Sequence, residues 1–122
     1  MSDEPLVSVV LIGFNDVGRI GRALESIRRQ TLRSIEIIVV DDASTDGTAE
    51  YVESVAVNDS RIRLLSRSEN SGGCSAPRND GLRMARAPWV MFCDSDDEYD
   101  IHACATLLRA AEDWNADVVC GT

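Results

Sequence analysis

IEIIVVDDASTDGT, residues 35–48, is the stretch of sequence that decides the fold. Its first six residues are mostly apolar on successive positions, which is typical of a strand buried on both faces of a parallel sheet that helices cover. The acidic and hydroxyl-bearing residues that follow predict a loop at the carboxyl end of that strand. Asp46, Gly47 and Thr48 then predict the start of a helix with an acidic cap.

The same alternation continues on both sides of this stretch. Four more apolar runs cover residues 7–12, 62–65, 89–93 and 118–120. Between the runs, apolar residues recur at helical spacing in four stripes, which are Val17, Ile20, Ala23, Leu24 and Ile27; Ala49, Val52, Val55 and Ala56; Leu82 and Ala85; and Ile101, Ala105, Leu108, Ala111 and Trp114. We expect Asp100 to cap the last helix, and Trp89 and Trp114 to lie in the core. Strands alternating with helices predict an α/β fold, a Rossmann-like parallel sheet with right-handed crossovers.

Length and composition narrow the function. The chain has 122 residues, about one domain, and its twelve basic residues are all Arg, against 21 acidic ones. A net charge of −9 argues against general nucleic-acid binding, and the absence of Lys excludes a P-loop lysine and a Schiff-base lysine. The one His, His102, is expected to be structural or exposed. Three of the four Cys lie in apolar segments without a C-x-x-C pair, so we expect reduced thiols and a cytoplasmic protein.

Ligands of such sheets bind beyond the carboxyl ends of the strands, near the point where the strand order reverses. The residues after each apolar run are therefore the candidates for the site. They are GFND at 13–16, DDASTDGT at 41–48, NSGG at 70–73 and DSDDE at 94–98. Every one of these segments is polar, and two of them carry acidic clusters.

The acidic cluster after the run at 89–93 predicts a cation. Asp94 and Asp96 are two positions apart, and Asp97 and Glu98 follow. Carboxylates this close repel one another, and a hard divalent cation would offset the repulsion. Ligands that are all oxygen favour Mg²⁺ or Mn²⁺, which completes its shell with substrate phosphates and water. The opposing interpretation is a solvated acidic turn that caps the next helix.

Asp42 has a second possible task, because a carboxylate at a strand end can accept hydrogen bonds from a nucleoside base or a ribose. A diphosphate ligand also needs positive charge, and without Lys that charge must come from an Arg. Arg78, which is followed by Asn79 at the start of the third predicted helix, is the best-placed candidate, although a surface role for it is equally compatible with the sequence.

Four segments in this order, at 7–15, 39–48, 70–81 and 92–97, resemble glycosyltransferase family 2. The resemblance covers residues 6–122 and implies an enzyme of the GT-A fold that takes a sugar from a nucleotide diphosphate, here a UDP-sugar, with inversion. By this resemblance, Phe14 and Asn15 occupy the positions where the family has an aromatic residue followed by Asn. The aromatic ring at the Phe14 position stacks on the nucleotide base, and Asp42 recognises the base. The family often has Tyr where Phe14 stands, so a hydroxyl contact would be lost.

The resemblance also assigns the diphosphate side of the site. Asp94 and Asp96 match the family's Asp-x-Asp, with Asp94 near the ribose and Asp96 on the Mn²⁺ or Mg²⁺ that bridges the diphosphate. Arg78 and Asn79 match its Ala-Arg-Asn segment, although Pro77 replaces the Ala. The NSGGCSAPRN form is similar to transferases fused to polyol-phosphate polymerases of bacterial cell-wall synthesis.

The general base and the acceptor surface of this family lie in its second half. We therefore expect this chain to be the N-terminal, donor-binding part of a longer protein, truncated after the fifth strand, with no catalytic base assigned. The acceptor stays open among a glycan, a lipid-linked acceptor and a polyol phosphate, and any membrane association would come through parts outside this chain. No segment here is a secretory signal or is long and apolar enough to span a membrane.

Three alternatives remain on the residues alone. A haloacid-dehalogenase-like phosphatase also places Asp-x-Asp after an apolar strand, and a response-regulator receiver also has acidic pairs at strand ends. Both depend on a Lys that this chain lacks. The third alternative is a non-catalytic module that binds a nucleotide sugar without turning it over.

Overall fold

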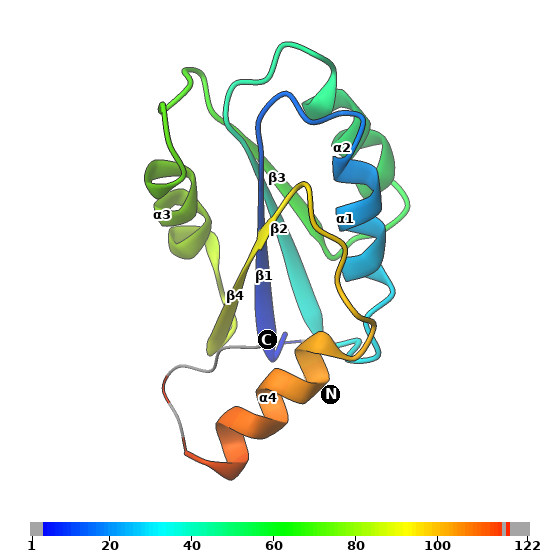
Figure 1. The fold of residues 1–122 in the computed structure, drawn as a ribbon, viewed down its shortest axis with the longest axis vertical. Helices are drawn as coiled ribbons and strands as arrows, with labels where there is room; N and C mark the ends of the chain where they lie inside the picture. Colours follow the sequence, from blue (N-terminus) through cyan, green and yellow to red (C-terminus); the bar gives the residue numbers. More distant parts are fainter. Residues whose placement is uncertain (1–3, 116, 118–122) are drawn as a thin grey trace.

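The computed structural model describes residues 4–115 and residue 117, and it has the alternating order that the sequence predicts (Figure 1). The elements are β1 (Val7–Gly13), α1 (Ile20–Arg28), β2 (Ile35–Asp41), α2 (Thr48–Ala56), β3 (Ile62–Ser66), α3 (Ser75–Met84), β4 (Trp89–Asp94) and α4 (Ala103–Asp113). The apolar run at 118–120, predicted as a fifth strand, lies outside the described residues.

The described strands form one parallel sheet in the order β3-β2-β1-β4. The chain builds outward from β1 through β2 to β3 and then returns to place β4 on the other side of β1. The strand order therefore reverses between β1 and β4, which is where an α/β sheet binds ligands. The register sets Gly13 beside Asp41 and Ile12 beside Asp94, so the polar ends of β2 and β4 flank the end of β1.

Helices cover both faces of the sheet, with α1 and α2 on one side and α3 on the other (Figure 1). The central strands are buried throughout, as their apolar runs predict: every residue of β2 is buried, and only Ile12 of β1 is partly exposed. The side chains of Val9, Leu11 and Ile37 face the α1–α2 layer, while Val10 and Ile38 belong to the α3 side. Because successive side chains point to opposite faces of the sheet, each strand contributes to two cores, one on each side.

The outer strands are less buried than their apolar runs suggest. In β3 only Ile62 is buried, and in β4 only Cys93 is, while Phe92 is 43% exposed. Each of these strands pairs with a single neighbour in the described sheet, so one side of it lacks cover. The prediction of strands buried on both faces is correct for β1 and β2 and wrong for β3 and β4.

The α3 stripe is a second correction. Leu82 is 50% exposed and Ala85 follows the helix, while the buried positions of α3 are Pro77 and Gly81. A Cβ built on Gly81 would collide with the side chain of Val10 on β1. The helix therefore packs through its smallest residue, because its backbone approaches the sheet too closely for a side chain. Apolar spacing could not reveal this contact.

The last helix departs from its predicted stripe at both ends. Cys104 and Ala111 are its buried residues, whereas Ile101 is 44% and Trp114 83% exposed, so Trp114 is not the core residue that its type suggests. Trp89 does pack against the core. Asp100 lies before α4 and accepts a hydrogen bond from the backbone N–H of His102, the residue that caps the helix. Within the described residues, we find no helix with the length and apolar character needed to cross a membrane.

Val17 also leaves its predicted helix, because α1 begins at Ile20 and Val17 is 40% exposed in the loop before it. The remaining members of that stripe, Ile20, Ala23, Leu24 and Ile27, are buried as predicted. In α2, Val52 is buried and Thr48 joins it at the first position of the helix. These two helices are the ones whose spacing the sequence predicted best.

Candidate functional site

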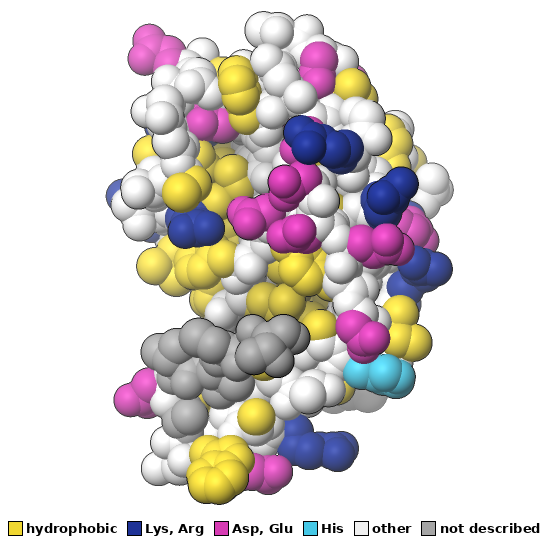
Figure 2. All heavy atoms as spheres, viewed as in Figure 1, with side chains coloured by type: hydrophobic (Ala, Val, Ile, Leu, Met, Phe, Trp, Pro, Cys, Tyr) yellow, Lys and Arg dark blue, Asp and Glu magenta, His cyan; other side chains and the backbone are white. Residues whose placement is uncertain are grey.

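Three carboxylates after β4 form a group that we call the β4 acidic cluster: Asp94, Asp96 and Asp97. One carboxylate oxygen from each lies within 4.8 Å of the others, and all three residues are exposed. Acidic side chains gather at the middle of the face in Figure 2, over the segment that follows β4 in Figure 1. The predicted pair thus gains a third member in Asp97. Close, exposed and purely oxygen-based, the cluster fits the ligand preferences of Mg²⁺ or Mn²⁺.

A buried serine holds the cluster in place from within. Ser95, between the outward-facing Asp94 and Asp96, is only 7% exposed, and its hydroxyl donates to the Asp16 carboxylate in the loop after β1. Asp16 is itself buried and pairs with Arg19 at 2.6 Å. The hydroxyl of Tyr99 accepts a 2.7 Å bond from the Asp94 backbone N–H. The β4 loop is therefore tied to the β1 loop and to its own continuation.

Arg78, the predicted diphosphate contact, lies beside the cluster. Its Nη2 is 3.9 Å from Oδ1 of Asp94, and its guanidinium lies over the Phe92 ring, 5.7 Å from the ring centroid. Its Nε is buried and has no hydrogen-bond partner among the described residues. An unpartnered donor beside a carboxylate cluster is a place where an anionic group could bind. Asn79 follows on α3 and is exposed.

Phe14 and Asn15 lie after β1, facing the β2 loop. Phe14 is 48% exposed, which leaves a ring surface free for stacking. Asn15 has a positive φ of 48°, and its Oδ1 accepts a 2.8 Å bond from the backbone N–H of Thr45. Its own backbone N–H donates to the hydroxyl of Ser44 at 2.8 Å. In this structure Asn15 therefore joins the two loops.

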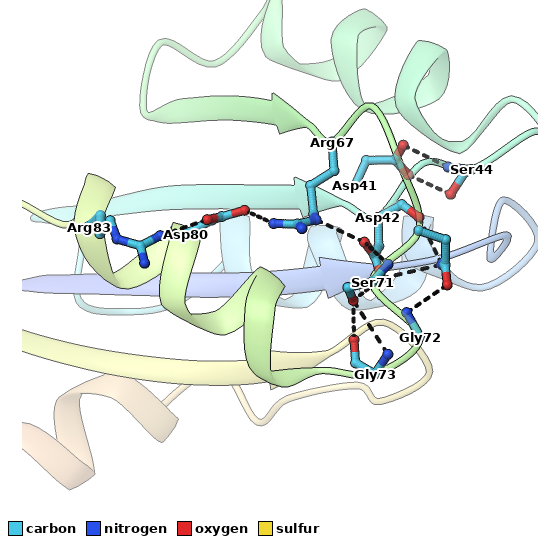
Figure 3. Close-up of polar contacts among 10 residues, drawn as sticks. Asp41, Asp42, Ser44, Arg67, Ser71, Gly72, Gly73, Asp80 and Arg83 are labelled. Carbon is cyan, nitrogen blue, oxygen red and sulfur yellow. Dashed lines mark hydrogen bonds and ion pairs between the residues drawn. The ribbon is translucent and has the colours of Figure 1, made fainter.

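Asp42 is the buried centre of a group that we call the Asp42 network: Asp42, Arg67, Asn70, Ser71 and Asp80. Figure 3 labels all of them except Asn70. Asp42 is 3% exposed. Its Oδ2 accepts from the Ser71 hydroxyl at 2.8 Å and from Asn70 Nδ2 at 3.3 Å, and its Oδ1 accepts from the Ser71 backbone N–H at 3.1 Å. The Nε of Arg67 forms an ion pair with Oδ1 at 3.1 Å. The carboxylate is thus fully partnered by protein groups.

The neighbouring Asp41 has a different role. It is 2% exposed, and it accepts from the backbone N–H of Ser44 at 3.1 Å and from the Ser44 hydroxyl at 2.5 Å. It therefore shapes the turn after β2 and leaves Asp42 as the residue that faces the segment 70–73. The N-cap of α2 is Gly47, not the predicted Asp46. Asp46 precedes it, and its Oδ1 accepts from the Thr48 backbone N–H at 3.0 Å and also from the Thr48 hydroxyl. The bond from the Thr48 hydroxyl is the main reason that the pKa of Asp46 is lowered.

Sequence reasoning did not find several residues that build this edge. Arg67 carries no motif. Asp80, Asp16 and Ser95 lie in segments that the sequence singles out, but nothing there indicates their partners, and Ser95 and Asp16 are 79 positions apart. The segment 70–73 is among the predicted site segments, but the sequence does not indicate its contact with Asp42. Gly72 does need its φ of 79°, but the bonds of Asn70 and Ser71 to Asp42 are what join the turn to β2.

The cysteines and the tyrosine near the cluster are unreactive. Burial raises the pKa of the Cys93 thiol to about 12 and that of Cys104 to about 11. Both are free and buried as predicted, whereas Cys74 is exposed; Cys120 lies outside the described residues. Burial also raises the pKa of Tyr99 well above its usual range. Cys93, Cys104 and Tyr99 are therefore not poised for nucleophilic or acid–base work near neutral pH.

The geometry brings the predicted site residues to one edge of the sheet. Asp94 and Asp42 lie at the ends of the two strands that flank β1, with Phe14 and Asn15 at the end of β1 itself. Arg78 lies at the Asp94 side. A cavity of about 720 Å³ lies elsewhere, between β4 and α4, and its lining is mostly apolar, including Met91 and Leu108. The polar edge is therefore the candidate site for a charged ligand.

Comparison with known proteins gives consistent results. Residues 8–122 match the family model described as Glycosyl transferase family 2. The poly(ribitol-phosphate) β-N-acetylglucosaminyltransferase TarP of Staphylococcus aureus is 34% identical over 117 residues, which are 94% of this chain and 36% of TarP. The chain spans a little over a third of the length of the curated relatives it matches first.

Two solved structures are similar to the fold. S. aureus TarS, in complex with UDP-GlcNAc, has a TM-score of 0.84 and 31% identity over 91% of this chain and 32% of the TarS chain. The mannosyltransferase PcManGT of Pyrobaculum calidifontis, in complex with GDP-Man and Mn²⁺, has a TM-score of 0.77 and 30% identity over 97% of this chain and 34% of its own. These neighbours are GT-A glycosyltransferases, so the expected fold class is confirmed.

Proposed function

The chain belongs to glycosyl transferase family 2, and from this premise we propose that it is the donor-binding part of an enzyme that transfers a sugar from a nucleotide diphosphate to an acceptor. The observation that carries the proposal is the meeting of the β4 acidic cluster, Arg78 and Asp42 at the edge where the strand order reverses. Family membership disfavours the phosphatase and receiver alternatives.

We propose UDP as the nucleotide. The TarS structure, similar in fold and 31% identical, is a complex with UDP-GlcNAc. Here the half-exposed ring of Phe14 would stack on the base, and Asp42 would accept from its N–H edge. Because Asp42 is already fully partnered, a base that reaches its carboxylate must replace one donor from the segment 70–73. Ser71, whose hydroxyl is the exposed end of the network, is the donor that can be replaced at least cost.

We propose that the diphosphate lies between Arg78 and the β4 acidic cluster. Asp94, Asp96 and Asp97 would hold Mg²⁺ or Mn²⁺, with Asp96 as the principal ligand and Asp94 also close to the ribose. The cation, when bound, neutralises negative charge on the diphosphate leaving group. The PcManGT complex contains Mn²⁺ and so supports a cation in a protein of this fold. Arg78 would add a second positive charge through its unpartnered Nε, and Asn79 would support it from the same turn of α3.

The transfer step would invert the configuration at the anomeric carbon. The acceptor hydroxyl oxygen bonds to that carbon, the bond to the diphosphate oxygen breaks, and the hydroxyl proton passes to a general base. We assign that base to none of the residues described here. As acceptor we favour a polyol-phosphate polymer, because TarP, which is 34% identical, is named as a poly(ribitol-phosphate) transferase. The buried free thiols of Cys93 and Cys104 support a cytoplasmic site of action.

Isothermal titration calorimetry of UDP binding to the chain, with and without Mn²⁺, tests this proposal. We expect Mn²⁺ to strengthen UDP binding by at least about tenfold, and Asp96→Ala to abolish that gain because it removes a cation ligand. Glu53→Ala is the matched control, since Glu53 is an exposed carboxylate on α2, away from the cluster. The assignment would be contradicted if the wild-type protein does not bind UDP. It would also be contradicted if Asp96→Ala leaves the affinity for UDP and its dependence on Mn²⁺ unchanged.

A further inference from the structure

We propose that Arg67 is a positioning residue for base recognition, which holds the carboxylate of Asp42 in its orientation and couples it to α3. The inference rests on the proposed function, in which Asp42 reads the base of the nucleotide. Arg67 follows β3, and its side chain extends between Asp42 at the end of β2 and Asp80 on α3 (Figure 3). No motif in the sequence singles it out.

The contacts of Arg67 join three elements. Its Nε pairs with Oδ1 of Asp42 at 3.1 Å as an ion pair that lacks hydrogen-bond alignment, and its Nη1 donates to Oδ2 of Asp80. Its backbone N–H donates to the carbonyl oxygen of Asp41 at 2.8 Å, which fastens the start of the side chain to β2. Asp80 is held in turn by Arg83, whose Nη1 lies 2.8 Å from Oδ1. Both ends of the bridge are therefore fixed.

Burial makes the bridge matter more than a surface ion pair. The side chains of Asp42, Asp80 and Arg67 are 5%, 20% and 24% exposed, so solvent screens them little. Two carboxylates that share one side of a helix–sheet contact would repel each other without the guanidinium between them. Planar guanidinium presents its donors in a fixed fork, which suits two carboxylates at once, whereas a lysine offers a single point charge.

The orientation of Asp42 depends on this bridge. Ser71 supplies a backbone N–H to Oδ1 and a hydroxyl to Oδ2, and it is exposed. When a base replaces the Ser71 hydroxyl, Arg67 remains as the charged partner of the carboxylate, beside the Ser71 backbone N–H and Asn70 Nδ2. Arg67 thus anchors Asp42 to α3, the helix that also carries Arg78, while Arg78 keeps its own contacts with Asp94 and Phe92. Loss of Arg67 should then harm base recognition while the diphosphate contacts survive.

The test compares UDP with inorganic pyrophosphate, both titrated into the full chain with Mn²⁺ by calorimetry. We expect Arg67→Gln to weaken UDP about tenfold and to change pyrophosphate less than twofold, because only UDP uses Asp42. Arg67→Lys should recover part of the loss, since it keeps the charge without the fork. Arg22→Gln is the matched control: it removes an exposed Arg from α1, on the other side of the sheet from α3, and should leave both ligands within twofold.

A double-mutant cycle separates positioning from general support of the fold. In an Asp42→Ala background, Arg67→Gln should cause no further loss of UDP affinity, because its effect runs through that carboxylate. If Arg67→Gln fails to fold, Asp80→Asn cuts the same bridge from α3 and should give a smaller loss that is again confined to UDP. The inference about Arg67 would be overturned if Arg67→Gln weakens UDP and pyrophosphate binding equally, or if its effect is undiminished in the Asp42→Ala background. In either case, UDP binding by the wild type would still support the proposed function. Wild-type protein that binds pyrophosphate but not UDP would overturn both.

Discussion

The Asp42 network and the β4 acidic cluster lie at the ends of strands that flank the same β1, and both are built on carboxylates. In the network, Asp42 is 3% exposed and every oxygen has a protein donor. In the cluster, the Asp94 side chain is 62% exposed, and its nearest positive group, on Arg78, is 3.9 Å away. One strand end thus satisfies its acids internally, and the other leaves them together and unneutralised.

The difference follows from the cost of burying charge. A carboxylate removed from water needs a partner and hydrogen bonds, so the buried Asp42 comes with Arg67 and Ser71. Exposed carboxylates keep their hydration and need no partner from the protein. Their grouping within 4.8 Å therefore leaves their oxygens open to solvent and to a ligand that binds from outside. The network is part of the structure, while the cluster is available for a cation.

The largest effect that tests this contrast is on stability. We expect Asp42→Ala to lower the free energy of unfolding by about 2–3 kcal/mol, because it leaves Arg67 and Ser71 without their buried acceptor. Asp96→Ala should change it by no more than about 0.5 kcal/mol, since the removed group is exposed. Urea unfolding followed by circular dichroism measures both. Equal losses in the two variants would erase the distinction between the regions.

A smaller effect should appear at a third carboxylate, which extends the comparison to the opposite end of β2. Glu36 is 3% exposed and accepts from the Ser8 hydroxyl at 2.5 Å and from the Arg86 backbone N–H at 2.6 Å, with Arg63 at 3.3 Å. Burial raises the pKa of Glu36, but the bonds from Ser8, Arg86 and Arg63 outweigh it, so its net pKa lies below 4.5. Glu36 therefore resembles Asp42 in being satisfied by the protein.

We expect Glu36→Gln to cost about 1–2 kcal/mol at pH 7. A lowered pKa in the folded state means that this contribution is complete above pH 4.5 and is lost as the pH falls through the folded value. The gap in unfolding free energy between wild type and Glu36→Gln should thus narrow on acidification below pH 4.5. Urea unfolding at a series of pH values measures the gap, and a gap that stays constant down to pH 3 would show that Glu36 gains nothing from its charge. Glu53→Gln, an exposed control on α2, should give a flat difference throughout.

The sequence predicted the parts of this molecule that depend on pattern. Apolar runs located β1 to β4, helical spacing located α1 and α2, and the acidic residues after the run at 89–93 located the cluster. It failed where contact between distant residues decides the outcome. Gly81 packs against Val10 because two backbones come close, and Trp114 is exposed although its residue type favours the core.

The same limit explains why the Asp42 network went unrecognised. Arg67 and Asp80 are 13 positions apart on different elements, and nothing in local composition marks an ion pair between them. Ser95 is likewise one small polar residue in an acidic run until the fold turns it inward toward Asp16. The residues of the exposed cluster are close together in the sequence, whereas the residues of the buried network come together only when the chain folds. Motif reading therefore finds ligand-facing groups more readily than the groups that hold them.

The smallest predicted effect is a difference in how strongly salt changes the stability of the two regions. Repulsion among the exposed carboxylates of the cluster is screened by ions, so raising NaCl from 0.01 to 0.5 M should reduce any stabilisation gained by Asp97→Asn, itself about 0.2–0.5 kcal/mol. The ion pair between Arg67 and Asp42 is buried and should respond much less, leaving the cost of Asp42→Ala within about 0.3 kcal/mol of its low-salt value. Glu53→Gln again controls for the −9 net charge, because it removes one negative charge far from either region. If Asp97→Asn and Glu53→Gln respond identically to salt, the three carboxylates do not repel one another as a group, and the reason for expecting a cation among them is lost.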